Sequence, residues 1–129
     1  MQHLLDLKNI MMKSVLVVED YDDIRTMMKI MVQMYGYNVI EARDGYEAIE
    51  KAKSQAPDLI LMDIAMPLMD GLSAARIIKT LEDCEDIPVI AVTAYRNMRD
   101  EAFEAGCVEV IDKPVEFPHL KKVLEQHLA

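Results

Sequence analysis

The feature that most constrains this chain is the alternation of short aliphatic segments with longer amphipathic ones. The aliphatic segments predict five strands, at Val15–Val18, Asn38–Ala42, Leu59–Met62, Val89–Thr93 and Val108–Ile111. The amphipathic segments predict five helices, over residues 22–35, Gly45–Gln55, the stretch around Leu72–Ile78, Asn97–Ala105 and His119–Leu128. Because strand and helix alternate with short links, we expect an α/β fold, a doubly wound parallel sheet with helices on both faces.

Residues that favour turns and helix ends separate these segments. Asp22 is a predicted N-cap of the first helix, and Gly36 is a predicted end for it. Pro67 and the Asp70-Gly71 pair mark Ile64–Gly71 as a loop. The apolar residues of the first helix that we expect to face the core are Ile24, Met27, Met28, Met31 and Tyr35. In the second helix the same reasoning selects Ala48, Ile49 and Ala52.

Length and charge narrow the class of protein. A chain of 129 residues is long enough for one domain, which we place at residues 13–129 after an N-terminal extension of residues 1–12. The net charge of −9 and the lack of a basic stripe argue against direct binding of nucleic acid. No apolar run approaches the roughly 20 residues that span a membrane. Asp6 and Lys8 interrupt the apolar N-terminus, so we expect a cytoplasmic protein without a signal peptide.

Polar side chains stand at the carboxyl ends of four predicted strands. In open parallel sheets, ligands bind beyond these strand ends. The side chains that should meet there are Glu19, Asp20, Asp63, Thr93 and Lys113. Each one has an ordinary explanation by itself, as a cap, a strand former or a surface charge. Their joint placement is what packing alone does not explain.

The chemistry of these groups indicates a metal-assisted phosphoryl transfer. Three neighbouring carboxylates repel one another, and a divalent cation such as Mg²⁺ relieves the repulsion through oxygen ligands. Asp20 and Asp63 can bind the ion directly with the backbone carbonyl of Ala65, and Glu19 can bind it directly or through water. The Asp63 carboxylate can also act as a nucleophile and form an aspartyl phosphate. Lys113, the Thr93 hydroxyl and backbone N–H groups of the 64–67 loop would then contact the phosphoryl oxygens.

Four segments together resemble the response-regulator receiver family of two-component signalling. They are Val-Val-Glu-Asp at 17–20, Leu-Met-Asp-Ile-Ala-Met-Pro-Leu-Met-Asp-Gly at 61–71, Ala-Val-Thr-Ala at 91–94 and Asp-Lys-Pro at 112–114. The likeness extends from about residue 13 to the end of the chain. It implies a flavodoxin-like sheet of strand order 2-1-3-4-5.

The resemblance also assigns roles to residues. It implies that Asp63 is the phosphoacceptor, that Glu19 and Asp20 are the acidic pair for Mg²⁺, that Thr93 is the switch hydroxyl and that Lys113 binds the phosphate. It further implies a cis peptide bond between Lys113 and Pro114. Such a domain is a signalling phosphoacceptor that catalyses only its own phosphorylation and dephosphorylation, and is not an enzyme in the usual sense.

The chain departs from the family pattern at one position. The family often has Tyr or Phe three residues before the lysine, where this chain has Val110. We expect Tyr95 to take over part of the switch role of that aromatic residue. Tyr95 and Ala65 are also expected to flank the phosphoryl group and to control how easily water reaches it.

The expected partners are a histidine kinase or a histidine phosphotransfer protein, and a downstream protein target. The first predicted helix carries Ile30, Val32 and Met34 outside its predicted core face. One interpretation is extra core packing. The other is an adaptable surface on which a helical phosphodonor docks.

Three other classes of function were compared with the receiver. A Mg²⁺-dependent phosphohydrolase of the haloacid dehalogenase type would need an acid two residues after the nucleophile, where this chain has Ala65. A flavin-binding electron carrier would need a phosphate loop after the first strand, where residues 19–23 are mainly acidic. A phosphorylation-independent scaffold would not need the complete acceptor set.

Overall fold

The computed structural model describes residues 12–66 and 68–128. The strands of this part of the chain are β1 (Ser14–Val18), β2 (Asn38–Ala42), β3 (Leu59–Asp63), β4 (Val89–Thr93) and β5 (Glu109–Asp112). Its α-helices are α2 (Asp22–Met34), α3 (Gly45–Gln55), α4 (Gly71–Thr80), α5 (Arg99–Glu104) and α6 (Phe117–Leu128), with a short 3-10 helix (Arg96–Met98) before α5. Residues 1–11, and with them nearly all of the predicted extension, lie outside the described residues.

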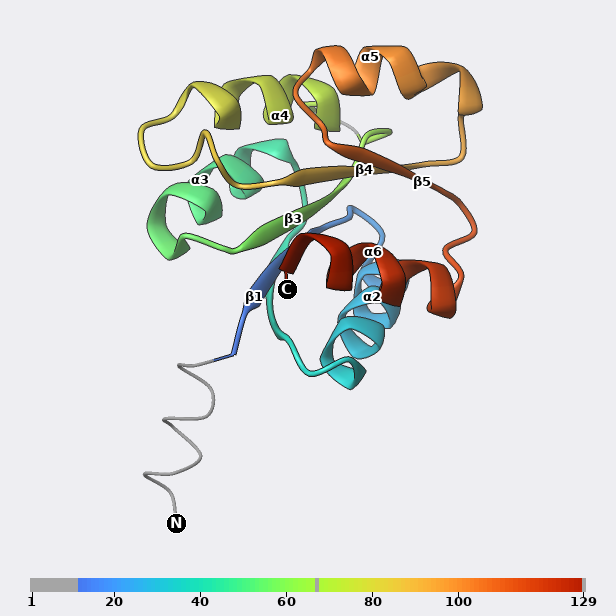
Figure 1. Cartoon of the computed structure of the whole chain (residues 1–129). Helices are drawn as coiled ribbons and strands as arrows, with labels where there is room; N and C mark the ends of the chain where they lie inside the picture. The colour runs from blue at the N-terminus through green and yellow to red at the C-terminus, as the bar shows by residue number, and fades with distance from the viewer. Residues whose placement is uncertain (1–11, 67, 129) are drawn as a thin grey trace.

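The five strands form one parallel sheet in the order β2-β1-β3-β4-β5, which confirms the predicted topology. Strand β1 pairs with β2 on one side and with β3 on the other, so it lies inside the sheet with β3 and β4 (Figure 1). The central strands β3 and β4 are buried along their whole length. This explains why both read as uninterrupted apolar runs, as expected for strands covered on both faces.

Alternate side chains of the strands point to opposite faces and build two cores. On one face, Val15, Leu61 and Ile90 pack with residues of α2 and α6. On the other face, Leu16, Ile60 and neighbouring residues pack under α3, α4 and α5. Figure 1 shows these two helical layers, with α2 and α6 on one side of the sheet and α3, α4 and α5 on the other.

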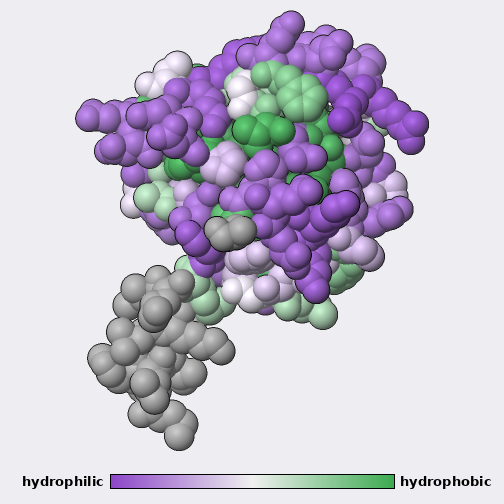
Figure 2. All heavy atoms as spheres, in the orientation of Figure 1, coloured by the Kyte–Doolittle hydropathy of each residue, from purple (hydrophilic) through white to green (hydrophobic). Residues whose placement is uncertain are grey.

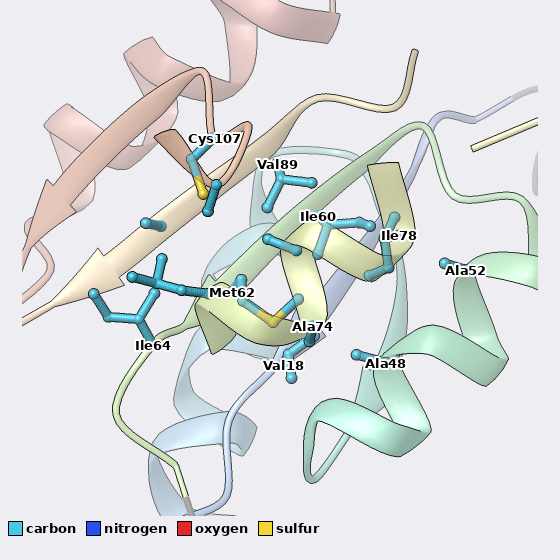
Figure 3. Packing of buried hydrophobic residues seen from close by; sticks show 14 of the residues in the cluster. Val18, Ala48, Ala52, Ile60, Met62, Ile64, Ala74, Ile78, Val89 and Cys107 are labelled. Carbon is cyan, nitrogen blue, oxygen red and sulfur yellow. The ribbon is translucent and has the colours of Figure 1, made fainter. Parts of the chain in front are cut away.

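The core under α3 and α4 joins small helical residues to large strand residues. Ala48 and Ala52 of α3 and Ala74 of α4 are fully buried, and their small side chains let the helices lie close to the sheet. Met62 of β3 and Ile78 of α4 fill the space between them (Figure 3). The two cysteines, Cys84 and Cys107, also belong to this core and are free thiols. Burial raises the pKa of the Cys107 thiol to about 11, so it stays protonated at neutral pH.

Helix α2 answers one open question about its faces and corrects one prediction. Its buried residues are Met28, Met31 and Val32, so for Val32 the interpretation of extra core packing is confirmed. Met27, which was predicted to face the core, is 54% exposed. At 100° per residue, the stripe through Met28 and Val32 leaves Met27 outside it. The sequence carries apolar residues on too wide an arc for the stripe to be chosen without the sheet.

Several predicted boundaries also change by a few residues. Tyr21, not Asp22, is the N-cap of α2, and Asp22 lies in the first helical turn, where its charge favours the helix dipole. Strand β5 begins at Glu109, and α6 begins at Phe117, two residues before the predicted start. The predicted helix end at Gly36 is confirmed, because Gly36 adopts a φ of 94° directly after the C-cap.

Hydrophilic residues predominate on the face shown in Figure 2, and hydrophobic residues reach its surface in a smaller area. None of the helices formed by the described residues is long and apolar enough to cross a membrane.

The two adjacent isoleucines of α4 give a matched test of the core. Ile78 is fully buried and Ile77 is 38% exposed. We expect Ile78→Ala to lower the free energy of unfolding by about 2–5 kcal/mol, because it leaves a cavity under α4. Ile77→Ala should cost less than about 1 kcal/mol, as surface substitutions do. Urea denaturation of the two variants measures both values, and equal losses would contradict the assignment of the buried face.

Candidate active site

The parallel strands bring the predicted side chains to one edge of the sheet. In chain order they are Glu19 directly after β1, Asp63 as the last residue of β3, Thr93 as the last residue of β4 and Lys113 directly after β5. Asp63 pairs with Val92 in register, so Thr93 lies one residue further along the neighbouring strand. All three polar strand-end residues Glu19, Asp63 and Thr93 are buried. Sequence reasoning therefore placed these groups correctly.

Three carboxylates form the centre of this site. One oxygen from each of Glu19, Asp20 and Asp63 lies within 4.8 Å of the others. Glu19 and Asp63 are each more than nine-tenths buried, and Asp20 is partly buried. Such a concentration of negative charge away from solvent is unfavourable unless cations compensate it.

Asp20 shows this strain most directly. Its Oδ1 atom is buried and has no hydrogen-bond partner among the described residues. Burial, together with the neighbouring Glu19 carboxylate, raises the pKa of Asp20 above its ordinary value. A buried carboxylate oxygen without a hydrogen bond normally costs free energy, so such an oxygen is typical of a position where a water molecule or an ion binds.

Lys113 supplies positive charge to the same cluster. Its Nζ atom lies 3.1 Å from Glu19 Oε1 and 3.4 Å from Asp63 Oδ2. Burial by itself would lower the pKa of this lysine, but the attraction of Asp63 and Glu19 outweighs it, and the pKa is raised. Lys113 is therefore held as a cation beside two of the three carboxylates. The peptide bond from Lys113 to Pro114 is cis, as the resemblance implied.

Backbone hydrogen bonds connect the segment after β3 to the Asp63 carboxylate and to the start of α4. The backbone N–H of Ala65 donates to Asp63 Oδ1 at 3.1 Å, and the Gly71 N–H donates to the Ile64 carbonyl at 3.3 Å. A Cβ atom at Gly71 would lie only 2.2 Å from the Asp63 carbonyl oxygen. Only glycine allows this approach, so the start of α4 can close against the end of β3. Asp70 completes the closure as the N-cap of α4 by accepting from the Ser73 N–H at 2.9 Å.

Sequence reasoning missed one residue that contacts this site through the backbone. Arg25 of α2 donates from Nη1 to the carbonyl oxygen of Glu19 at 2.9 Å. The close approach of Gly71 was also missed, although its Asp-Gly pair had marked the loop. Arg25 is also held by Glu41 of β2, and this contact between two separate elements leaves no signal in residue spacing.

An apolar cavity of about 420 Å³ opens beside the site. Helix α2 contributes Ile24, Met27 and Met28 to its wall, and Pro114 and Val115 also line it. Glu19, Asp63 and Lys113 also line it, so the polar site and the cavity share a boundary. The charged groups of the site therefore lie next to a cavity whose other lining residues are apolar.

A comparison with known families decides what this arrangement is. The family model of the response regulator receiver domain matches residues 15–125. The chain belongs to this family. It is a receiver domain with a phosphoacceptor role in two-component signalling.

Relatives and solved structures agree with this assignment. The polar-differentiation response regulator DivK of Brucella ovis is 38% identical over 121 residues, which cover 92% of this chain and 98% of that protein. The structure of the chemotaxis protein CheY4 of Vibrio cholerae has a TM-score of 0.85 at 30% identity and covers 91% of this chain and 99% of its own. The response regulator TrrA of Thermotoga maritima, solved in complex with Mg²⁺-BeF, has a TM-score of 0.84 at 35% identity, with 91% and 100% covered.

The structure also describes the three residues that were predicted to form a switch, Thr93, Tyr95 and Val110. Thr93 is fully buried, and its Oγ1 accepts from the backbone N–H of Tyr95 at 2.9 Å. The Tyr95 side chain is 57% exposed. Val110 is buried in the core under α4 and α5, where a small side chain is accommodated. The transfer of the aromatic role to Tyr95 stays a prediction.

The strain at Asp20 predicts that removing its charge stabilises the fold. In Asp20→Asn, the side-chain amide can donate to Glu19 where a carboxylate repels it. We expect the free energy of unfolding at pH 7, without divalent cations, to rise by roughly 0.5–2 kcal/mol. Because the pKa of Asp20 is raised in the folded state, its ionisation destabilises the fold above that pKa. The difference from wild type should therefore shrink as the pH falls through it.

Urea denaturation between pH 4 and pH 7 measures this difference. Glu50→Gln, which removes one negative charge from the exposed surface of α3, is the control and should change stability by less than about 0.5 kcal/mol. A destabilised Asp20→Asn protein would show that the carboxylate is compensated by the fold itself.

Proposed function

We propose that this receiver domain takes a phosphoryl group from a phosphohistidine onto the carboxylate of Asp63, with the help of Mg²⁺. The observation that carries the proposal is the position of Asp63, a buried carboxylate at a strand end between two further carboxylates and Lys113. An Asp63 oxygen attacks phosphorus, and the bond between phosphorus and the donor histidine breaks. The electron pair of that bond stays on the ring nitrogen, so a phosphohistidine that is protonated on its other ring nitrogen leaves as neutral imidazole, and Asp63 becomes an aspartyl phosphate.

The residues of the site fit Mg²⁺. The ion prefers oxygen ligands, and three carboxylates lie within 4.8 Å of one another with one buried Asp20 oxygen unpaired. We propose that Asp20 and Asp63 bind the ion with the backbone carbonyl of Ala65, and that Glu19 acts directly or through water. When bound, the ion neutralises carboxylate charge and phosphoryl charge together. The complex of TrrA with Mg²⁺-BeF supports the choice of metal.

The remaining groups of the site stabilise the transferred group. Lys113 is a held cation whose ammonium can move from Glu19 to a phosphoryl oxygen. The Thr93 hydroxyl oxygen already accepts from Tyr95, so its proton is available to donate to the phosphoryl group. We propose that Ala65 and Tyr95 flank the group and limit the access of water.

The residues of the site argue against two alternative functions, a phosphohydrolase and a phosphorylation-independent scaffold. A phosphohydrolase of the haloacid dehalogenase type would need a general acid two residues after Asp63, where this chain has Ala65. A phosphorylation-independent scaffold would not need an acidic cluster that lowers the stability of the fold. We propose instead that the domain catalyses only its own phosphorylation and dephosphorylation. Its acidic charge also argues against nucleic acid as the direct partner.

The phosphoacceptor is tested by the intact mass of the protein after incubation with acetyl phosphate and Mg²⁺. We expect a gain of one phosphoryl group, about 80 Da, in the wild type and none in Asp63→Asn, because the acyl phosphate forms on that carboxylate. Chelation of Mg²⁺ should abolish the gain. A wild type without an adduct, and without a stable beryllofluoride complex, would favour the scaffold.

The phosphodonor needs a surface beside the site, and α2 offers one. Met27, Ile30 and Met34 are exposed by 54%, 51% and 70% and follow each other at spacings of three and four residues, so they share one face. Met27 also lines the cavity to which Asp63 contributes. We propose that a helix of the histidine kinase or phosphotransfer protein lies on this face, with apolar side chains against the methionines.

The docking surface is tested with two kinds of phosphodonor. We expect Ile30→Lys with Met34→Lys to slow phosphotransfer from a histidine phosphotransfer protein at least about tenfold, because charged side chains would be buried in an apolar contact. Transfer from acetyl phosphate should be unchanged. Val108→Lys, at an exposed apolar residue just before β5, is the matched control. An equal loss with both donors would show damage to the site and would contradict docking.

A further inference from the structure

Arg25 lies beside the acidic site without touching its carboxylate triad. Its side chain is only 11% exposed, although it belongs to the first turns of a surface helix. The guanidinium has partners on three segments of the chain. Nη1 donates to the Glu19 carbonyl at 2.9 Å, Nη2 to Asp22 Oδ1 at 2.6 Å and Nε to Glu41 Oε1 at 3.3 Å.

These contacts join β1, β2 and α2 at the point where the acidic pair begins. The N–H of Glu19 donates to the Ala42 carbonyl at the end of β2 at 3.1 Å. The carbonyl of Glu19 is held by Arg25, which is in turn held by Glu41 of β2. The N–H of Glu19 is therefore bound to β2 directly, and its carbonyl is connected to β2 through Arg25. The Glu19 carbonyl belongs to the peptide that leads into Asp20, so its orientation restrains the backbone from which the Asp20 side chain projects.

We infer that Arg25 is a positioning residue for the divalent cation, acting through the peptide between Glu19 and Asp20. This inference rests on the Mg²⁺ site of the proposed function and adds a residue that holds its ligand in place. The guanidinium suits the role because its three nitrogens form a rigid planar fork that reaches three separated acceptors, whereas the three donors of a lysine share one nitrogen. Arg25 keeps Asp20 in a strained, cation-ready position when no ion is bound.

The sign of the effect separates positioning from simple electrostatics. Arg25 is a cation near a cation-binding site, so its charge alone opposes Mg²⁺ binding, and removing the charge should strengthen binding. If Arg25 acts by positioning, its removal should weaken binding. The outer partners of metal ligands typically contribute 10- to 100-fold to metal affinity, and we expect a loss of roughly 10-fold in Arg25→Gln.

The experiment is isothermal titration calorimetry of Mg²⁺ into wild type, Arg25→Gln and Arg25→Lys, each freed of metal and shown to be folded by circular dichroism. Arg25→Lys keeps the charge and one contact, so its affinity should fall between the other two. Arg43→Gln is the control, because Arg43 is an exposed arginine just after β2 that pairs with Glu47. It loses the same charge, and its affinity should be unchanged or slightly raised.

The outcomes distinguish this inference from the proposed function. If wild type binds Mg²⁺ and Arg25→Gln binds it equally or more tightly, the positioning role is wrong and the metal site stands. If wild type does not bind Mg²⁺, the metal part of the proposed function is wrong, and the inference is wrong with it. If Arg25→Gln fails to fold, Arg25→Lys decides, and wild-type affinity in that variant overturns the inference.

Discussion

The rest of the site depends on the repulsion among three carboxylates held at one edge of the sheet. Glu19, Asp20 and Asp63 would separate in a flexible chain, and the fold prevents this. Lys113 offsets part of the negative charge, and the Asp20 oxygen is left without a partner. A buried anionic cluster that is compensated only in part lowers stability, and the cation that we propose for it would offset this cost.

The two cores provide the rigidity that this repulsion requires. Strands β3 and β4 are buried on both faces, so the ends that carry Asp63 and Thr93 cannot shift without disturbing helices on both sides. Gly71 adds a local restraint, since its missing side chain lets α4 begin directly against the Asp63 carbonyl. Asp63, the acid that we propose as phosphoacceptor, is thus held by the packing of β3 between the two helical layers and by the contact of its carbonyl with Gly71.

Chemistry and recognition lie next to each other in this molecule. Helix α2 follows the acidic pair closely, and one of its exposed methionines, Met27, lines the same cavity as Asp63. The same helix carries Arg25, which holds the Glu19 carbonyl. A partner that packs on α2, as we propose, would therefore contact the helix that also holds the backbone of the acidic pair.

The sequence by itself determined the alternation of strands and helices, the parallel sheet that this alternation implies and the set of polar residues at its carboxyl edge, while the strand order was implied by the family resemblance. It could do so because periodicity and strand-end position are local properties, and parallel strands bring their ends to one edge. Only the tertiary structure decided which stripe of α2 is buried, because apolar residues cover too much of that helix, so Val32 is in the core and Met27 is at the surface. The contacts of Arg25 and Gly71 were likewise decided in space, since they join residues whose approach depends on how two cores set the helices against the sheet.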